Sequence, residues 1–194
     1  MKKRIILASA SPRRRDLMTQ IGLEFEIMVS QKEEPIPDHM SPVEICQREA
    51  RVKARDVADQ AAEKYPGEEV LVIGADTVVA YGDKILGKPT DAADAARMLR
   101  LLSGNVHQVY TGVSVISLPE GRENGFAERT DVEVTDLTEE DIAAYLETGE
   151  PFDKAGSYGI QGWFARFVKG IQGDYNNVVG LPVGRLYREH LKEE

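Results

Sequence analysis

Apolar and polar positions recur along this chain with two periods, one typical of strands and one typical of helices. Short apolar or alternating runs predict strands at 4–8, 24–29, 68–87, 106–117, 125–135 and 164–171, the third containing a Gly82-Asp83 hairpin turn. Helical spacing predicts helices at 11–22, 42–64, 91–104 and 138–149 and from Pro182 onward. The two kinds of element alternate irregularly, which predicts an α/β fold with a mixed sheet.

Local signals locate the ends and inner faces of these helices. Ser11 followed by Pro12 is typical of a helix start, with Ser11 as N-cap, and Thr138 with Asp141 fits a capping box. The first helix is expected to point Leu17, Met18 and Ile21 inward. The helix at 42–64 is expected to bury Val43, Ile45, Ala50, Val57 and Ala61.

Composition narrows the class of protein. The 194 residues are 42% hydrophobic, enough for one domain or two closely joined lobes. A net charge of −9 disfavours nucleic acid or an anionic membrane as the main partner. The first apolar run is too short for a signal peptide or a membrane span, so we expect a soluble, cytoplasmic protein. The single cysteine, Cys46, excludes an intrachain disulfide and a thiolate zinc site and is expected to be a buried thiol.

The segment "SASPRRR", residues 9–15, is unexpectedly basic for an acidic chain. It places two serine hydroxyls and a helix N-terminus at one point, with arginines in the first helical turn. Free amides, hydroxyls and guanidinium groups together favour a bound phosphate. A capped helix with solvated arginines explains the segment equally well when it is taken alone.

A lone aspartate, Asp76 in "GADT", interrupts the most apolar segment of the chain. Burying a carboxylate is costly unless a metal, a lysine or backbone amides compensate it. Glu33 and Glu34 are candidates for a second carboxylate on Mg²⁺, although charged loop residues are usually only solvated. Lys88 and Lys154, in predicted turns beside glycine or proline, could direct a cation at a site, and Lys53 lies on a predicted helix; each is also explained as an ordinary surface lysine.

The segment "SYGIQG", residues 157–162, places Gln161 between glycines with Tyr158 nearby. A glutamine amide can pair with the N3–H and a carbonyl of uracil or thymine, whereas cytosine presents a different edge. A solvent-facing loop glutamine is the alternative.

Five stretches together resemble the Maf family of nucleoside triphosphate pyrophosphatases across nearly the whole chain. They are "LASASPRRRDLM", "REARVKAR", "VIGADTVV", "LGKPTDAADAARMLRLLSGNVHQVYTGV" and the glycine-rich region that begins "PFDKAGSYGIQG". The resemblance implies a single domain over residues 1–194. It also implies a long mixed sheet flanked by helices and a cleft between two lobes, as in inosine triphosphate pyrophosphatases.

The resemblance also implies roles for individual residues. Asp76 matches the catalytic and metal-binding aspartate of the family, with Glu34 as a second metal ligand and a divalent cation such as Mg²⁺, Mn²⁺ or Co²⁺ as cofactor. Lys53 and Lys88 match catalytic lysines. The residues matched to substrate binding are Ser9, Ser11, Arg14, Thr77, Lys154 and Gln161. Among these, Arg14, Thr77 and Gln161 match the branch that acts on dTTP and UTP rather than on 7-methyl-GTP.

The implied reaction is hydrolysis between the α and β phosphates by water, giving a monophosphate and pyrophosphate. Removal of the Asp76 carboxylate should then lower the rate by orders of magnitude, whereas Gln161→Ala should mainly relax base choice. A non-catalytic nucleotide sensor that regulates cell division is the alternative; nucleic-acid binding through residues 13–15 is disfavoured by the net charge. A homodimer is expected by analogy, with Trp163, Phe164 and Tyr175 as candidates for an apolar contact.

Overall fold

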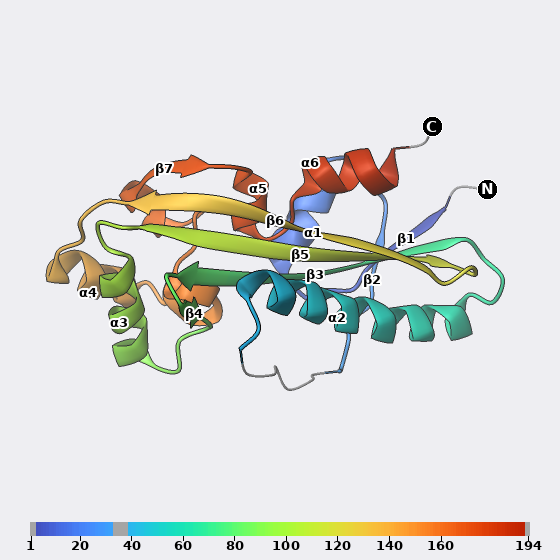
Figure 1. Cartoon of the computed structure of the whole chain (residues 1–194), viewed down its shortest axis with the longest axis horizontal. Coiled ribbons are helices and arrows are strands. Elements are labelled where there is room, and N and C mark those ends of the chain that lie inside the picture. The colour runs from blue at the N-terminus through green and yellow to red at the C-terminus, as the bar shows by residue number, and fades with distance from the viewer. Residues whose placement is uncertain (1–2, 33–38, 193–194) are drawn as a thin grey trace. The chain divides into compact units, whose positions relative to one another are not determined.

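The computed structural model of the chain describes residues 3–32 and 39–192 (Figure 1). The strands are β1 Arg4–Leu7, β2 Glu26–Ile27, β3 Val70–Tyr81, β4 Lys84–Leu86, β5 Val106–Leu118, β6 Arg122–Val134 and β7 Val168–Gln172. The helices are α1 Pro12–Gln20, α2 Pro42–Lys64, α3 Ala92–Leu102, α4 Glu139–Glu147, α5 Tyr175–Val179 and α6 Val183–Leu186. Short 3₁₀ turns are η1 Glu150–Asp153, η2 Ala155–Ser157 and η3 Trp163–Phe167, and a π turn, η4 Tyr187–Leu191, follows α6.

Within the described residues the strands form one seven-stranded sheet. Its order is β2-β1-β3-β5-β6-β7, with β4 paired to β3. Strand β1 is parallel to both β2 and β3, whereas β4 is antiparallel to β3 and β7 is antiparallel to β6. The predicted α/β fold with a mixed sheet flanked by helices is therefore confirmed.

The chain divides into two compact units whose boundaries fall inside β3, β5 and β6 and directly after α5. The first unit contains residues 1–76, 111–128 and 180–194, and the second contains 77–110 and 129–179. Each unit therefore takes pieces from distant parts of the chain. The single domain and the central cleft remain predictions.

The first unit is built around the packing of α2 on β1 and β3. A buried cluster joins Ile6 of β1, Val57 and Ala61 of α2, and Val72 of β3. Strand β3 carries no side chain at Gly74, where an added Cβ would lie 2.8 Å from the Ala54 Cβ. The helix therefore rests directly on the strand backbone, because glycine and alanine leave room for close approach.

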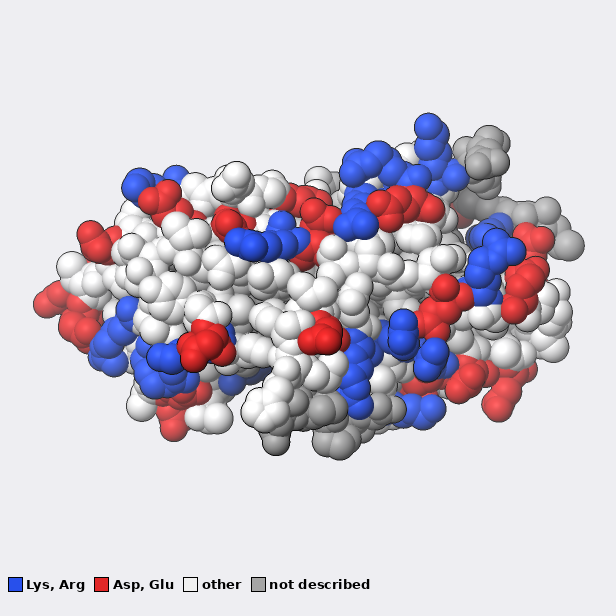
Figure 2. Space-filling view, in the orientation of Figure 1, with Lys and Arg blue, Asp and Glu red and all other residues white. Residues whose placement is uncertain are grey.

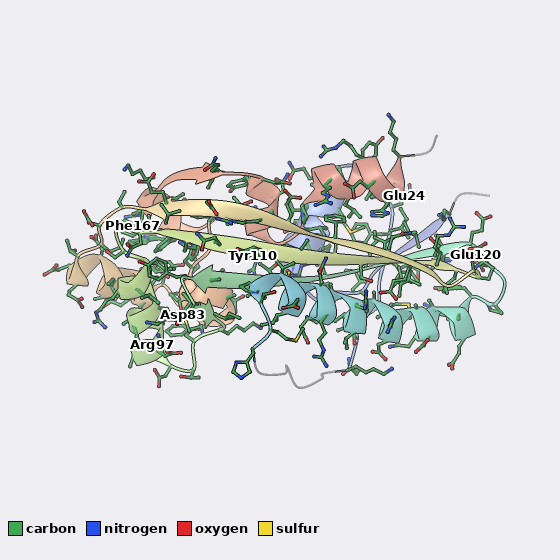
Figure 3. The ribbon with its side chains drawn as sticks, viewed as in Figure 1. Glu24, Asp83, Arg97, Tyr110, Glu120 and Phe167 are labelled. Carbon is green, nitrogen blue, oxygen red and sulfur yellow. The ribbon has the colours of Figure 1, made fainter. Side chains whose placement is uncertain are left out.

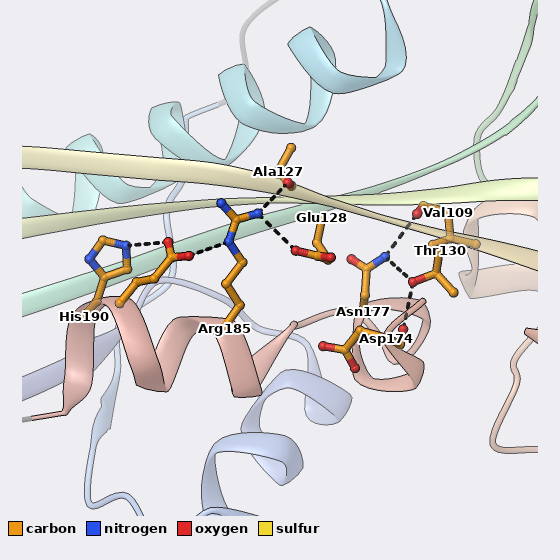
Figure 4. Close-up of polar contacts among 9 residues, drawn as sticks. Val109, Ala127, Glu128, Thr130, Asp174, Asn177, Arg185 and His190 are labelled. Atoms are coloured by element: carbon orange, nitrogen blue, oxygen red, sulfur yellow. Dashed lines mark hydrogen bonds and ion pairs between the residues drawn. The ribbon is translucent and has the colours of Figure 1, made fainter. Parts of the chain in front are cut away.

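The C-terminal helix α6 is attached to β6 in the same unit (Figure 4). The Arg185 guanidinium donates to the Ala127 carbonyl at 3.1 Å and to the Glu128 carboxylate at 3.0 Å, and its Nε donates to Glu189 at 2.8 Å. In Figure 1, α6 lies on the opposite side of β5 and β6 from α2. These contacts hold α6, and with it the residues that connect Gly180 to this helix, against β6.

The second unit has its own buried polar contacts. The Asn177 amide donates to the Val109 carbonyl at 3.1 Å and to the Thr130 hydroxyl at 3.0 Å, which holds α5 against β5 and β6 (Figure 4). The fully buried His107 lies with its Nε2 2.7 Å from the Tyr158 hydroxyl. Arg97, labelled in Figure 3, projects from α3 at the surface.

Several local predictions were wrong. Strand β2 contains two residues instead of the six expected, and the last strand begins at Val168 rather than 164. The short helix α5 was not expected. Ser11 occupies the N-cap position of α1, but its side chain makes no capping hydrogen bond. Val43 is 37% exposed, because the first turn of α2 projects beyond the core.

Other predictions hold closely. Helix α2 spans the expected 42–64, the hairpin at Gly82-Asp83 connects β3 to β4, and α4 begins with the Thr138 and Asp141 capping box. Within the described part of the chain, no helix is long and apolar enough to cross a membrane.

Candidate active site

The Asp76 carboxylate is paired with a lysine in the first unit. Lys53 Nζ donates to Asp76 Oδ1 at 2.6 Å, and the two side chains are 30% and 21% exposed. Lys53 is the compensating cation that the isolated aspartate required, so the alternative of backbone amides as its partners is not needed. Both side chains remain partly accessible to solvent and therefore to a substrate.

The tight packing of α2 on β3 explains how this pair forms. Gly74 lies two residues before Asp76 on β3, and Ala54, the residue that meets Gly74, follows Lys53 on α2. An added Cβ at Gly74 would also overlap the Ala50 carbonyl. The close approach of helix and strand at Gly74 thus places the Lys53 ammonium on the Asp76 carboxylate.

In the arginine-rich segment, the Arg14 guanidinium contacts groups of the first unit. Arg14 Nε donates to the Gly180 carbonyl at 2.8 Å, and its Nη1 donates to the buried Ser9 hydroxyl at 3.2 Å. The Ser9 hydroxyl also accepts the Ser11 amide at 3.2 Å. Gly180 has φ of +130°, a conformation that favours glycine. Ser9, Arg14, Lys53 and Asp76 are called the Asp76 site below.

Electrostatics connects the members of the Asp76 site. Burial lowers the pKa of the Arg14 guanidinium, and the attraction of the Asp76 carboxylate partly offsets this shift. Arginine remains protonated at neutral pH even so. Burial, and then the negative charge of Asp76, raises the pKa of Cys46 to about 12, so the thiol stays neutral and is not a nucleophile. The prediction that Cys46 is buried is confirmed.

Parallel strand pairing brings the two motifs of this site together where β1 ends beside the middle of β3. Leu7 is in register with Ile73, and the Ala8 amide donates to the Ile73 carbonyl at 2.8 Å. Ser9 comes two residues after Leu7, and Asp76 comes three residues after Ile73. The carboxyl end of a parallel strand such as β1 is a common location for phosphate-binding residues.

In the second unit, Lys88 and Lys154 lie on two segments joined through their backbones. The Gly156 amide donates to the Gly87 carbonyl at 3.1 Å, and Lys88 follows directly with an exposed side chain. The Lys154 ammonium donates to the Glu150 carbonyl at 2.7 Å and to Asp153 at 2.5 Å. The two predicted turns are therefore neighbours.

Gln161 is at the exposed tip of a turn, and Thr77 is partly buried in β3 of the same unit. The turn closes through a hydrogen bond of 3.2 Å from the Gly162 amide to the Gly159 carbonyl. Residues Gly159–Trp163 are called the Gln161 turn below. The prediction that Phe164 lies at a subunit contact is wrong, because this ring is fully buried; Trp163 is half-buried and Tyr175 is 43% exposed.

Some residues near these sites were not expected from the sequence. The Gly180 carbonyl receives Arg14, and Glu150 and Tyr145 contact the Gln161 turn. The two glycines that flank Gln161 were the available signal, because glycine often marks a close approach by another group. The sequence pattern did not indicate which side chain lies close to these glycines.

The metal-binding prediction rests on Asp76 within the described residues, since Glu34 lies outside them. Among the residues that the structure describes, no group of three or more His, Cys, Asp or Glu side chains could hold a metal ion. Mg²⁺ commonly uses one or two carboxylates and completes its shell with water and substrate phosphates. A single accessible carboxylate fits a metal that is bound together with its substrate.

Charged side chains are interspersed on the face of the molecule drawn in Figure 2. On α2, for example, Arg51 and Arg55 pair with Glu123 at 2.6 and 2.9 Å. Arg14, by contrast, directs its guanidinium at the buried Ser9 hydroxyl and at the Gly180 carbonyl.

The chain belongs to the Maf family, because the family description "Maf-like protein" matches residues 4–193. A relative from Agathobacter rectalis named "dTTP/UTP pyrophosphatase" is 53% identical, over 97% of this chain and 96% of its own. A relative of the same name from Bacillus cytotoxicus is 52% identical, over 96% of this chain and 94% of its own. Among solved structures, the Staphylococcus aureus Ham1 protein matches 69% of this chain and 73% of its own at 15% identity and TM-score 0.39, too low to support an argument.

Proposed function

We propose that this protein hydrolyses dTTP and UTP between the α and β phosphates, giving the nucleoside monophosphate and pyrophosphate. The proposal rests on the 2.6 Å contact between Lys53 of α2 and Asp76 of β3. This contact holds an ammonium against a partly accessible carboxylate on an otherwise apolar strand. The two relatives above, both more than half identical, are named for this reaction.

Asp76 orients the attacking water and accepts its proton in the proposed reaction. A carboxylate is suited to this because its second oxygen stays available when Oδ1 is held by Lys53. Water attacks the α phosphorus, the α–β bridging bond breaks, and pyrophosphate leaves. No covalent intermediate with the protein is required.

Cationic side chains stabilise the charge that accumulates on the phosphate oxygens. The Arg14 guanidinium lies beside the Ser9 hydroxyl and the Gly180 carbonyl, and the Lys53 ammonium lies on the carboxylate that orients the water. Lys88 and Lys154 are proposed to serve the departing pyrophosphate, with the hydroxyls of Ser9 and Ser11 donating to phosphate oxygens.

Asp76 would hold the divalent cation, with Mg²⁺ as the proposed ion. When bound, such an ion neutralises phosphate charge and supplies Lewis acidity. Glu34 remains a proposed second ligand. The alternative divalent ions Mn²⁺ and Co²⁺ favour similar oxygen donors.

Base choice is assigned to Gln161, with Arg14 and Thr77. An amide has a donor and an acceptor to match the N3–H and a carbonyl of uracil or thymine, whereas cytosine has an acceptor at N3. Homodimer formation and a cytoplasmic location remain predictions. A nucleotide sensor would bind the same substrates without turnover, so measured turnover separates it from the enzyme.

The experiment measures pyrophosphate release by the purified protein with Mg²⁺ on dTTP, UTP, CTP, ATP, GTP and 7-methyl-GTP. The expected result is activity on dTTP and UTP that falls about a thousandfold in Asp76→Asn. Asp16→Asn, which removes an exposed carboxylate of α1, is the matched control. Near-normal turnover by Asp76→Asn would contradict the assignment, and nucleotide binding without turnover would favour the sensor.

A further inference from the structure

The Gln161 turn is held at both ends by two side chains from another segment. The Gly159 amide donates to the Tyr145 hydroxyl at 3.2 Å, and the Trp163 amide donates to Glu150 Oε2 at 2.9 Å. The Tyr145 hydroxyl donates in turn to Glu150 Oε1 at 2.8 Å. One carboxylate and one hydroxyl therefore connect the first and last residues of the turn.

The glycines of the turn are needed for space around this carboxylate. A Cβ on Gly162 would overlap the Glu150 carboxyl group. Gly162 has φ of −99°, outside the left-handed region that favours glycine, so the crowding by Glu150 is the steric reason that the structure offers for this glycine. At Gly159 an added Cβ would lie 3.2 Å from Glu150 Oε1 and 2.8 Å from the Lys154 Cε.

A buried aromatic cluster supports the same contact. The Tyr145 side chain is fully buried, and its ring stacks on Trp163 with centroids 5.6 Å apart. Phe164, also fully buried, lies 5.1 Å from the Tyr145 ring. The base of the turn is therefore packed and hydrogen-bonded, while Gln161 at its tip is exposed.

Glu150 also connects this turn to a candidate phosphate ligand. Its backbone carbonyl accepts the Lys154 ammonium at 2.7 Å, while its carboxylate accepts the Trp163 amide. A single residue thus contacts both the lysine and the turn that carries the glutamine. A change in its side chain is expected to act on the turn while leaving the backbone contact to Lys154.

We infer that Glu150 and Tyr145 are positioning residues that determine base choice by fixing the Gln161 turn. The inference rests on the proposed function, since it assigns the origin of the selectivity proposed for Gln161. Neither residue needs to touch the nucleotide. An exposed side chain selects among bases only when the turn that carries it presents it at one position, because a turn that moves can place the amide against other base edges.

The first experiment compares kcat/KM on UTP and on CTP for the full chain and two conservative variants. Glu150→Gln keeps the size of the side chain but removes one of its two acceptor oxygens, and Tyr145→Phe removes only the bridging hydroxyl. Each is expected to lower the UTP-to-CTP ratio about tenfold, with a smaller change in kcat on UTP. The control is Glu139→Gln, on α4 with Tyr145, which alters an exposed ion pair with Arg100 of α3. It should leave the ratio unchanged.

A double-variant cycle separates positioning from general destabilisation. Gly162→Ala alone should lower the ratio, because its Cβ displaces the Glu150 carboxylate. In the Glu150→Ala background the same substitution should cause little further loss, since the overlap is gone. Additive losses, or a fall in thermal stability with an unchanged ratio in every variant, would overturn the inference.

The outcomes for the proposed function remain distinct. If the wild type prefers UTP and Gln161→Ala loses that preference while Glu150→Gln and Tyr145→Phe keep it, the function stands and the inference is wrong. If the wild type hydrolyses neither UTP nor dTTP, the proposed function itself is wrong, and the assignment of base choice is wrong with it.

Discussion

The Asp76 site and the Gln161 turn are held in place by different kinds of contact. The first places its side chains on or beside regular elements, β1, α1, α2 and β3, and connects them through short polar contacts between the candidate residues. The second is an irregular segment whose candidate residue is exposed, and its neighbours are held by backbone hydrogen bonds and by the packing of Trp163 on Tyr145.

This difference separates two kinds of functional residue. Groups that carry charge in a reaction benefit from rigid elements, because small displacements are costly there. A residue that chooses among bases is placed on a turn, where a few supporting contacts decide its position. We therefore expect substitutions in the first region to reduce turnover or folding and substitutions in the second to alter selectivity.

The largest effect is expected from Gly74→Val, which should destabilise the fold by about 3 kcal/mol or more. A side chain there would collide with α2 at Ala54 and separate Lys53 from Asp76. Urea unfolding gives the measurement. Gly170→Val, in β7 with open space around its Cβ, is the matched control and should change stability little. Equal losses in both would show that strand glycines, rather than helix contact, are responsible.

Lys53→Met should lower kcat on UTP about a hundredfold, and it should also lower thermal stability because the partly buried Asp76 carboxylate loses its compensating cation. The variant keeps the length of the side chain but removes the ammonium that lies on Asp76. Lys64→Met removes an exposed lysine from the end of the same helix and should retain wild-type rates. A Lys53→Met enzyme with normal kcat would place this lysine outside the reaction.

Lowering the pH should reduce the free energy of unfolding through the titration of His107 in the second unit. Burial lowers the pKa of His107 to about 4, below the value near 6.5 of the unfolded chain. Its neutral form therefore stabilises the fold above pH 6.5, and this contribution is lost as the pH falls toward 4. At pH 5 the loss is about 2 kcal/mol. Urea unfolding at pH 7.5 and 5 should show it, with a flatter response in His107→Gln; parallel pH profiles would contradict the assignment.

The smallest effect is expected from Gln161→Ala, which should lower the UTP-to-CTP ratio of kcat/KM about tenfold and leave thermal stability unchanged. Gln161 is exposed, so its truncation costs no packing. Gln31→Ala, at another exposed glutamine, is a suitable control. A large fall in stability would show that the side chain supports the turn instead of reading the base.

Local sequence signals predicted much of the fold. The 42–64 helix, the Gly82-Asp83 hairpin and the Thr138 capping box depend on residues close in sequence, and each is found where expected. Helix α5 was missed because it has only five residues and is held by Asn177, whose partners are distant in the chain. Strand β2 was overpredicted, since alternation does not show how many residues find a partner strand.

The amino-acid sequence shows which residues are chemically unusual: an aspartate in an apolar strand, arginines at a helix start, and a glutamine between glycines. Their partners are seen only in the folded chain, where Lys53 pairs with Asp76, the Gly180 carbonyl accepts Arg14, and Glu150 lies against the glycines around Gln161. Burial makes an unpaired charge or polar group costly, so a polar residue in an apolar segment indicates that a partner is needed. The identity of the partner depends on packing between segments far apart in the chain, which a local sequence pattern does not show.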